Sequence, residues 1–285
     1  MKRTWAGRKR PAFTAVELLV VITIIAILAA LVVAAASRVL KMQAWMGASS
    51  DITRMQQSLE TARAAYGQIE YLPSKLRLFN DINVYRTTTD AEVKRSANVL
   101  RKMFGRRFIT NGGTVTWGPA AAGTAGGATL TGSECLTFYL GGMTDVANRR
   151  CLGFSNNPLD PTASGGERIG PFYSFVPSRL SAGPSGTFFQ YRDPWNTPYA
   201  FFGAYSPNNY DSTHAETFGA STVSPYGSSG NWVNPKTYQI ISAGPNMLFG
   251  AGGSSWSPGN GYGDANNGTD DLANFSGAQL GEPQS

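Results

Sequence analysis

Apolar residues are arranged along the chain in two different patterns. The first is an almost unbroken apolar run from Phe13 to Ala36, which comes after a short basic leader. As a helix that rises about 1.5 Å per residue, this run would be about 36 Å long, enough to cross the apolar core of a bilayer. Basic residues in front of such a run favour retention of the leader in the cytoplasm and export of the residues beyond the run. We therefore expect a cytoplasmic leader at residues 1–12 and a transmembrane helix at residues 13–36.

The second pattern places an apolar residue at every third or fourth position, over Trp45, Ala48, Ile52, Met55, Leu59, Ala62 and Tyr66. This spacing is typical of a helix with one apolar face, and charged residues such as Asp51 and Arg54 are assigned to its other faces. Gly67 and Pro73 indicate that the helix ends nearby. Residues 37–70 are therefore predicted to continue the helix in amphipathic form and to pack against a head.

Residues 71–285 are predicted to form a loop-rich globular head. Asp90–Phe104 has the pattern of a short helix with a capping aspartate at its start. Cys135–Gly142 fits either a strand or a helix, Gly186–Tyr205 fits a hairpin with two aromatic strands, and Lys236–Gly244 fits a strand. The predicted fold class is α+β: a long N-terminal helix, membrane-spanning in its first half, packed on a small antiparallel β-sheet head.

The charge of the chain is unevenly distributed. The formal net charge is +6, but five of the 24 basic residues lie in the leader, so the rest of the chain is almost neutral. After Phe201 the only basic residue is Lys236. A surface that binds nucleic acid needs basic residues clustered on the folded part. On this distribution we expect no nucleic-acid partner.

Glu17 is the one carboxylate inside the apolar run, and a carboxylate in a bilayer is costly unless it is paired. A secretory signal peptide would have a shorter apolar core and a cleavage site of small residues, for which Ala34–Ser37 is the candidate. A plain membrane anchor explains the length of the run but not Glu17. The third interpretation is a prepilin: "AFTAVELLVVITIIAILAALVV" resembles the N-terminal methylation motif of type IV pilins and type II secretion pseudopilins.

This resemblance implies that a prepilin peptidase cuts between Ala12 and Phe13 and then methylates the new amino group of Phe13. Glu17 is the fifth residue from the cut, where the family has its glutamate, whereas Ala12 stands where the family has glycine. A buried ammonium and a buried carboxylate offset much of each other's desolvation cost when they pair. Glu17 is therefore expected to neutralise the Phe13 amine and to set the register between subunits.

Two stretches of the head carry the same resemblance. "DPWNTPY" (Asp193–Tyr199) is similar to the Asp-Pro-Trp-Gly-x-Pro-Tyr turn of the major pseudopilins, and "YQIISAGPNMLFG…TDDLANF" is similar to their C-terminal strand and loop. The resemblance implies a calcium site in residues 242–275. Its candidate ligands are Asn246, Asp264, Asn266, Asn267, Asp270 and Asp271. Oxygen-rich flexible loops suit calcium, but Asn246 replaces a family aspartate and would weaken binding. A solvated loop without metal is the alternative.

The remaining reactive residues are few. Cys135 and Cys151 are the only cysteines, and export would permit a disulfide between them, with two free thiols as the alternative. His214 is the only histidine and lies in a polar stretch without a nucleophile motif beside it. Two cysteines and one histidine are also too few for an ordinary zinc site. We expect no enzymatic activity.

The resemblance implies a structural subunit of a type II secretion pseudopilus, which drives protein export. Its partners would be other copies of the chain, prepilin peptidase, the inner-membrane assembly platform and minor pseudopilins. The subunit would be a single-pass protein of the bacterial inner membrane with its head in the periplasm. Alternatives are a type IV pilin or minor pilin in an extracellular filament, and a membrane-anchored binding or adhesin module that does not polymerise. Residues 80–188 match no pattern of the family.

Overall fold

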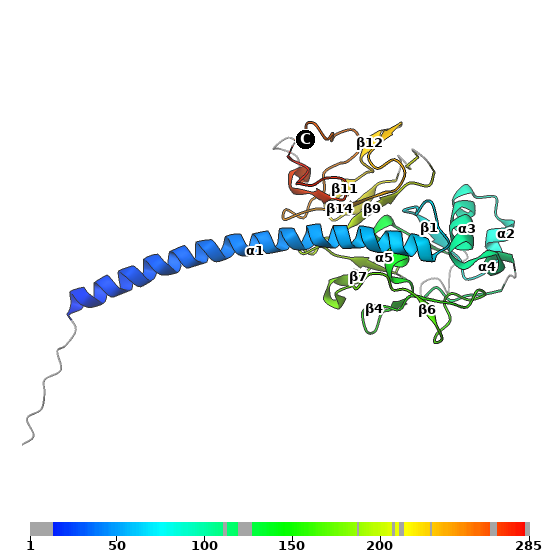
Figure 1. The fold of residues 1–285 in the computed structure, drawn as a ribbon, viewed down its shortest axis with the longest axis horizontal. Coiled ribbons are helices and arrows are strands. Elements are labelled where there is room, and N and C mark those ends of the chain that lie inside the picture. The colour runs from blue at the N-terminus through cyan, green and yellow to red at the C-terminus, as the bar shows by residue number, and fades with distance from the viewer. Residues whose placement is uncertain are drawn as a thin grey trace, which may run out of the picture. The chain divides into compact units, whose positions relative to one another are not determined.

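The computed structural model of the chain describes residues 14–110, 113–118, 127–186, 188–206, 209–210, 214–228, 230–262 and 267–282 (Figure 1). The chain divides into two compact units, Met1–Trp45 and Met46–Ser285. The boundary falls inside helix α1 (Ala15–Ala65). The long helix expected from the sequence is therefore one continuous element of 51 residues.

The part of α1 in the first unit is apolar and exposed. Its large apolar side chains from Val16 to Val33 are between 44% and 70% exposed. An 18-residue window of this helix reaches a mean hydropathy of 3.2, and none of that window is buried. By length and composition, it is the one helix within the described ranges that could cross a membrane.

In the second unit, one face of α1 is buried as the spacing of its apolar residues predicts. Ala48, Met55, Leu59 and Ala62 have no exposed surface, and Ile52 is only 4% exposed. The helix ends where expected, because Gly67 adopts a left-handed φ of 78° that terminates the turn. The Arg63 guanidinium then donates to the backbone oxygens of Ile69 (2.9 Å) and Glu70 (2.8 Å), which satisfies carbonyls just beyond the helix.

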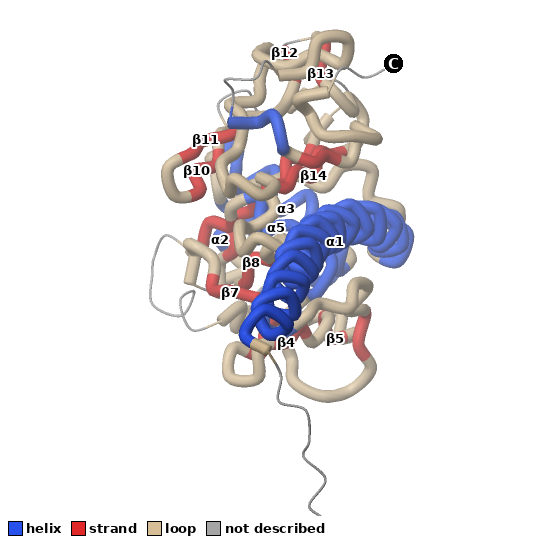
Figure 2. Tube along the Cα trace, turned by 90° about the vertical axis from the view of Figure 1, so that its left-hand side faces the viewer, coloured by secondary structure: helices blue, strands red, loops and turns tan. Residues whose placement is uncertain are grey.

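The sheets of the head are small and antiparallel. The largest has three strands in the order β15 (Leu272–Ala273), β14 (Tyr238–Ser242) and β9 (Ala200–Gly203), with Ile241 paired with Ala273 on one side and Ala200 on the other. Figure 2 shows the short strands separated by loops. The two-stranded pairs are β1 (Leu76–Leu78) with β2 (Ala128–Leu130), β3 (Thr144–Asp145) with β4 (Arg150–Cys151), β5 (Phe154–Ser155) with β6 (Arg168–Ile169), β7 (Leu180–Ala182) with β8 (Phe189–Tyr191), β10 (Glu216–Phe218) with β11 (Ser221–Val223), and β12 (Gly227–Ser228) with β13 (Asn231–Trp232).

The other helices are α2 (Val84–Thr87), α3 (Ala91–Phe104), α4 (Arg106–Thr110) and α5 (Gly132–Gly141), with 3-10 turns at Pro177–Arg179 and Asn267–Asp270. Asp90 caps α3 as predicted, since its side chain accepts from the backbone N–H groups of Glu92 and Val93. The ambiguous stretch around Cys135 is the buried helix α5, which begins with a capping box of Thr131 and Glu134. The fold class is α+β, as expected.

The predicted hairpin at Gly186–Tyr205 is wrong in its pairing. Both strands form, but β8 pairs with β7 and β9 pairs with β14. Between β8 and β9, among the described residues, the pairing is limited to a bridge between Arg192 and Pro198, with bonds from Asp193 N–H to the Thr197 carbonyl (2.7 Å) and from Tyr199 N–H to the Tyr191 carbonyl (3.0 Å). Beyond this bridge each strand pairs with a segment that the local turn sequence does not specify, β7 for β8 and β14 for β9.

Candidate functional site

Glu17 is held by a residue three positions before it. The Thr14 backbone N–H and hydroxyl donate to Glu17 Oε2 at 2.8 and 2.9 Å, and the Glu17 N–H donates to Thr14 Oγ1 at 3.2 Å. This reciprocal arrangement is a capping box at the start of α1, where a carboxylate also interacts favourably with the positive end of the helix dipole. Glu17 thus has a local structural role that the sequence analysis missed, although the Thr-x-x-Glu spacing signals it.

The capping box leaves part of Glu17 available. Its second carboxylate oxygen, Oε1, accepts no hydrogen bond from the residues that the structure describes. That oxygen could face an ammonium group while Oε2 stays bonded to Thr14. The predicted cleavage site, Ala12 and Phe13, lies outside the described residues.

The Asp193–Tyr199 turn is built around one buried carboxylate. Asp193 Oδ1 accepts from the backbone N–H groups of Trp195 (3.0 Å) and Thr197 (2.9 Å). Asn196 has a φ of 75°, in the left-handed region that glycine and then asparagine tolerate best. Asparagine can therefore occupy the position at which the family turn has glycine.

The two head stretches that carry the resemblance contact each other directly. Ser242, at the end of β14, donates from its hydroxyl to Asp193 Oδ2 at 2.6 Å. Both residues are buried, and burial raises the pKa of Asp193, whereas the bond from Ser242 acts to lower it. Sequence positions about fifty residues apart thus form one polar contact in the core of the head.

The C-terminal loop is tied together by Asn246. Its backbone N–H donates to Asp270 Oδ2 (2.9 Å) and its amide donates to the Asn267 carbonyl (2.7 Å), while its amide oxygen accepts from Leu248 N–H (2.6 Å). Gly244, at a φ of 65°, lies so close to the Asp270 carbonyl that a Cβ would clash with it. Asn246 therefore links the first part of the loop, after Gly244, to the part that contains Asn267 and Asp270.

Asp270 and Asp271 are the acidic groups of this loop that the structure describes. Asp271 is fully buried, and its Oδ2 accepts from Gly250 N–H at 2.9 Å and from the Tyr226 hydroxyl at 3.3 Å. The Oδ1 atoms of both aspartates are buried without a hydrogen-bond partner. Burial raises the pKa of both carboxyl groups, that of Asp271 well above its ordinary range.

The two carboxylate oxygens without a hydrogen-bond partner could supply part of the ligand set of a cation site. Calcium needs six to eight oxygens, and in the described part of the chain no cluster of three or more acidic, His or Cys residues forms. Of the other predicted ligands, Asp264 and Asn266 lie outside the described residues, and the side chain of Asn246 is engaged within the loop.

Asp51 is a buried acidic residue that sequence reasoning placed on the wrong face of α1. It is 8% exposed, and its Oδ2 forms an ion pair with the Arg179 guanidinium at 2.7 Å. The hydroxyls of Tyr173 and Tyr199 donate to its two oxygens at 2.8 and 3.3 Å. The signal was in the spacing, because position 51 lies three residues after Ala48 and thus on the buried face.

A second buried acidic pair, Glu134 and Glu216, lies where α5 begins. Glu134 accepts from Thr131 N–H at 3.0 Å and from both the backbone and the hydroxyl of Ser185, and Glu216 accepts from Ser133 N–H at 3.2 Å. Burial raises the pKa of both carboxyl groups, that of Glu216 to about 8. Nothing in the local sequence signals this pair, since the two residues are far apart in the chain.

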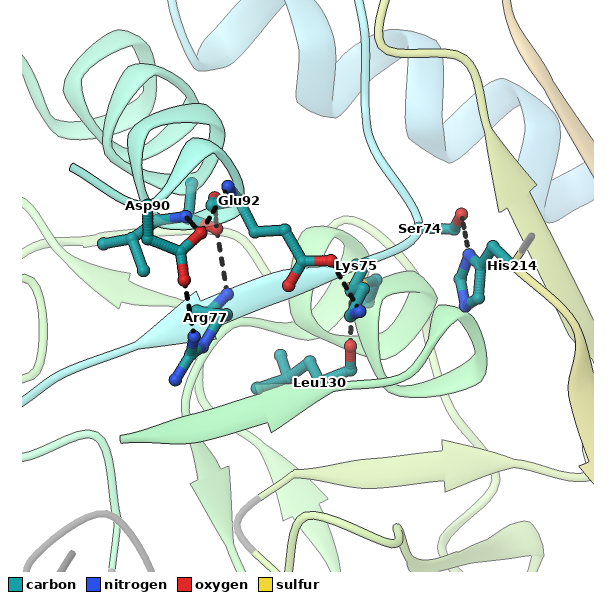
Figure 3. Close-up of polar contacts among 10 residues, drawn as sticks. Ser74, Lys75, Arg77, Asp90, Glu92, Leu130 and His214 are labelled. Carbon is teal, nitrogen blue, oxygen red and sulfur yellow. Dashed lines mark hydrogen bonds and ion pairs between the residues drawn. The ribbon is translucent and has the colours of Figure 1, made fainter. Parts of the chain in front are cut away.

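Cys135 and Cys151, on α5 and β4, are free thiols in the structure, which is the alternative given beside the disulfide. Burial raises the pKa of both thiols, that of Cys151 to about 12, so neither is poised as a thiolate. His214 is half-buried, with its Nδ1 at 3.0 Å from Ser74 Oγ (Figure 3).

A comparison of the chain with protein-family models, with curated protein sequences and with solved structures finds no match in any of the three.

Proposed function

We propose that this chain is a pilin-like structural subunit that is anchored in the bacterial inner membrane and then assembles into a helical filament. The observation that carries the proposal is α1, a single helix of 51 residues with an exposed apolar first part and a buried apolar stripe in its last part. Exposed apolar surface of this extent needs a lipid or protein partner. A membrane supplies it before assembly, and neighbouring copies supply it afterwards.

The filament that we propose is a type II secretion pseudopilus, which drives export of other proteins. The contact between Ser242 and Asp193 supports this choice, because it joins the two stretches that resemble major pseudopilins. Prepilin peptidase would cut between Ala12 and Phe13 and methylate Phe13. The head would lie in the periplasm, where an assembly platform and minor pseudopilins would be its partners.

Glu17 has a defined role in this proposal. Its Oε2 completes the capping box with Thr14, and its Oε1 is the atom that would neutralise the Phe13 amine of the same or a neighbouring subunit. Pairing is needed because an unpaired ammonium or carboxylate in an apolar environment costs several kcal/mol. The pairing would thereby fix the axial register of one subunit against the next.

Intact mass and N-terminal sequencing of the protein from native membranes test the proposed processing. We expect a chain that begins at N-methylated Phe13. A chain that begins at Met1 would contradict processing and favour an anchored module that does not polymerise. A chain that begins after Ala36 would remove the assembly helix and exclude a filament.

We also propose that the C-terminal loop binds calcium, with Asp270 and Asp271 each offering the oxygen that has no hydrogen-bond partner. Bound calcium would offset the burial of two adjacent carboxylates and fold the loop more tightly. Because a ligand that binds only the folded state stabilises it, calcium is expected to raise Tm and chelator to lower it. Asp271→Asn should abolish this response, whereas Asp145→Asn, in an ion pair with the exposed Arg150 outside the loop, should retain it. Equal Tm values with calcium and with chelator would contradict the site.

A further inference from the structure

A groove of about 340 Å³ lies on the head beside helix α3. Its floor is apolar, with the buried side chains of Ile69, Pro73 and Val99. Tyr71 and Tyr205 form half-buried walls, and the exposed cations Arg95, Arg101 and Lys102 stand at its rim. We call this feature the α3 groove.

The α3 groove belongs to a basic surface that the nearly neutral total charge of the head conceals. Helices α3 and α4 carry six exposed basic side chains and one acidic side chain, Glu92; the basic ones are Lys94, Arg95, Arg101, Lys102, Arg106 and Arg107. The expectation of no nucleic-acid partner rested on totals, which do not describe this face.

Two cations near the groove, Lys75 and Arg77, are neutralised by ion pairs, but the three at its rim are not. Figure 3 shows Lys75 paired with Glu92 and Arg77 paired with Asp90, at 2.7 and 3.2 Å. No carboxylate among the described residues lies within ion-pair distance of any of the three rim cations, and none lines the groove. The α3 groove therefore offers uncompensated positive charge.

Two of the rim cations are held in place without using up their donors. The Arg95 guanidinium stacks over the Tyr205 ring, with Cζ 4.6 Å from the ring centre. One guanidinium nitrogen of Arg101 donates to Asn98 Oδ1 at 2.9 Å, which leaves its other N–H groups free. Guanidinium groups fixed in this way can bind a carboxylate by two parallel hydrogen bonds with little further loss of side-chain freedom.

We propose that the α3 groove binds an acidic segment of another polypeptide, with an aromatic or aliphatic side chain on the floor and flanking carboxylates at the rim cations. Tyrosine and arginine around an apolar centre are typical of protein-binding surfaces. Single-stranded nucleic acid binds by stacking bases on open aromatic faces, and Arg95 already covers one face of Tyr205. The inference does not depend on whether the chain forms a filament.

The test is binding of a fluorescent peptide, Glu-Glu-Phe-Glu-Glu, to the full chain in detergent. The groove variant is Arg95→Gln/Arg101→Gln/Lys102→Gln. The matched control is Lys94→Gln/Arg106→Gln/Arg107→Gln, which removes the same number of positive charges from α3 and α4 at positions that do not line the groove. We expect the groove variant to bind about tenfold more weakly and the control less than about threefold more weakly, with affinity falling as salt rises. All exchanged residues are exposed, so equal melting curves would verify that both variants fold.

Three results would overturn the proposal. Equal losses of affinity in the two variants would mean that the peptide is attracted by the basic surface in general and does not bind in the groove. Equal binding of Gln-Gln-Phe-Gln-Gln, or no binding up to about 1 mM, would exclude recognition of acidic groups. Tighter binding of oligothymidylate than of the peptide, lost only in the groove variant, would assign the groove to nucleic acid.

Discussion

The apolar part of α1 and the head hold their acidic groups in opposite ways. Glu17, in the apolar part, is bonded to Thr14, three residues before it. In the second unit, where α1 packs against the head, Asp51 is bonded to Arg179, Tyr173 and Tyr199, more than a hundred residues away along the chain. An acid whose hydrogen-bond donors are its neighbours in the sequence keeps them when the helix moves from one environment to another. An acid whose donors come from distant segments stabilises one particular fold.

This difference has a consequence for what each acid can do. Glu17 Oε1 has no donor among the described residues and is exposed, so Glu17 is able to pair with a group outside its own helix. The oxygens of Asp51 are both occupied, and its ion-pair partner Arg179 is only 23% exposed. Substitution of the buried acids in the second unit is therefore expected to lower or raise the stability of the fold. Substitution of Glu17 is expected to affect assembly.

The largest stability effect is expected from Asp51→Ala. Removing one member of a buried ion pair leaves the other charge uncompensated, which costs about 3–5 kcal/mol when both are fully buried. Because Arg179 retains some exposure, we expect a loss of about 3 kcal/mol in the free energy of unfolding of the full chain in detergent.

Glu92→Gln is the matched control for Asp51→Ala, since it breaks an exposed ion pair with Lys75. Such pairs contribute under about 1 kcal/mol. Denaturant unfolding monitored by tryptophan fluorescence measures both variants. If Asp51→Ala destabilised the head no more than Glu92→Gln, long-range partners would not be what stabilises it.

A smaller, pH-dependent effect is expected from Glu216→Gln. Burial raises the pKa of Glu216 to about 8, so the folded state binds its proton more tightly than the unfolded state. The stability that the protonated group contributes is complete below its ordinary pKa of 4.5 and is lost as pH rises through about 8. Glutamine cannot ionise, so the variant should be more stable than the wild type at pH 9 by at least about 1 kcal/mol.

Unfolding at pH 5 and pH 9 checks this prediction. The advantage of the Glu216→Gln variant should grow with pH, and a difference that stayed constant would contradict a buried carboxyl group. The groups that face Glu216, namely Gly132, Ser133, Glu134 and Cys135, remain unchanged in the variant.

The smallest effect is expected at Asn196, a head residue that depends on local backbone conformation. At a φ of 75°, alanine is disfavoured by about 1–2 kcal/mol and asparagine by less, whereas glycine is unstrained. Asn196→Ala should destabilise the head by about 1 kcal/mol relative to Asn196→Gly. Thermal unfolding of the two variants side by side makes the comparison, and equal Tm values would mean that the turn relaxes.

The elements and contacts that were predicted correctly are those that depend on neighbours in the sequence. The apolar stripe of α1, the cap of α3 at Asp90 and the strand ending before Gly244 all derive from spacing or from one residue's local preference. The features that were missed depend on distant partners: the pairing of β8 with β7, the burial of Asp51, and the meeting of Glu134 with Glu216.

The candidate sites divide in the same way. Sequence singled out Asp270 and Asp271 and the two stretches that contain Asp193 and Ser242. Only the structure brings Asp193 and Ser242 into contact and leaves an oxygen of each of the other two without a partner. The α3 groove was hidden because total charge averages over the surface. A count of basic residues along α3 and α4 alone would have indicated the basic surface, but not the groove, whose floor and walls come partly from Ile69, Tyr71, Pro73 and Tyr205.

The most direct test of the proposed filament is assembly of Glu17→Gln compared with Thr14→Ala, measured as sedimentable filaments from cells that contain the full assembly apparatus. Glutamine keeps an oxygen for the capping box but removes the charge, whereas Thr14→Ala removes both hydroxyl bonds of the capping box and keeps the charge. If Glu17 neutralises the Phe13 amine, Glu17→Gln should abolish assembly and Thr14→Ala should leave most of it. Normal assembly of Glu17→Gln would reduce Glu17 to a helix cap and contradict the account.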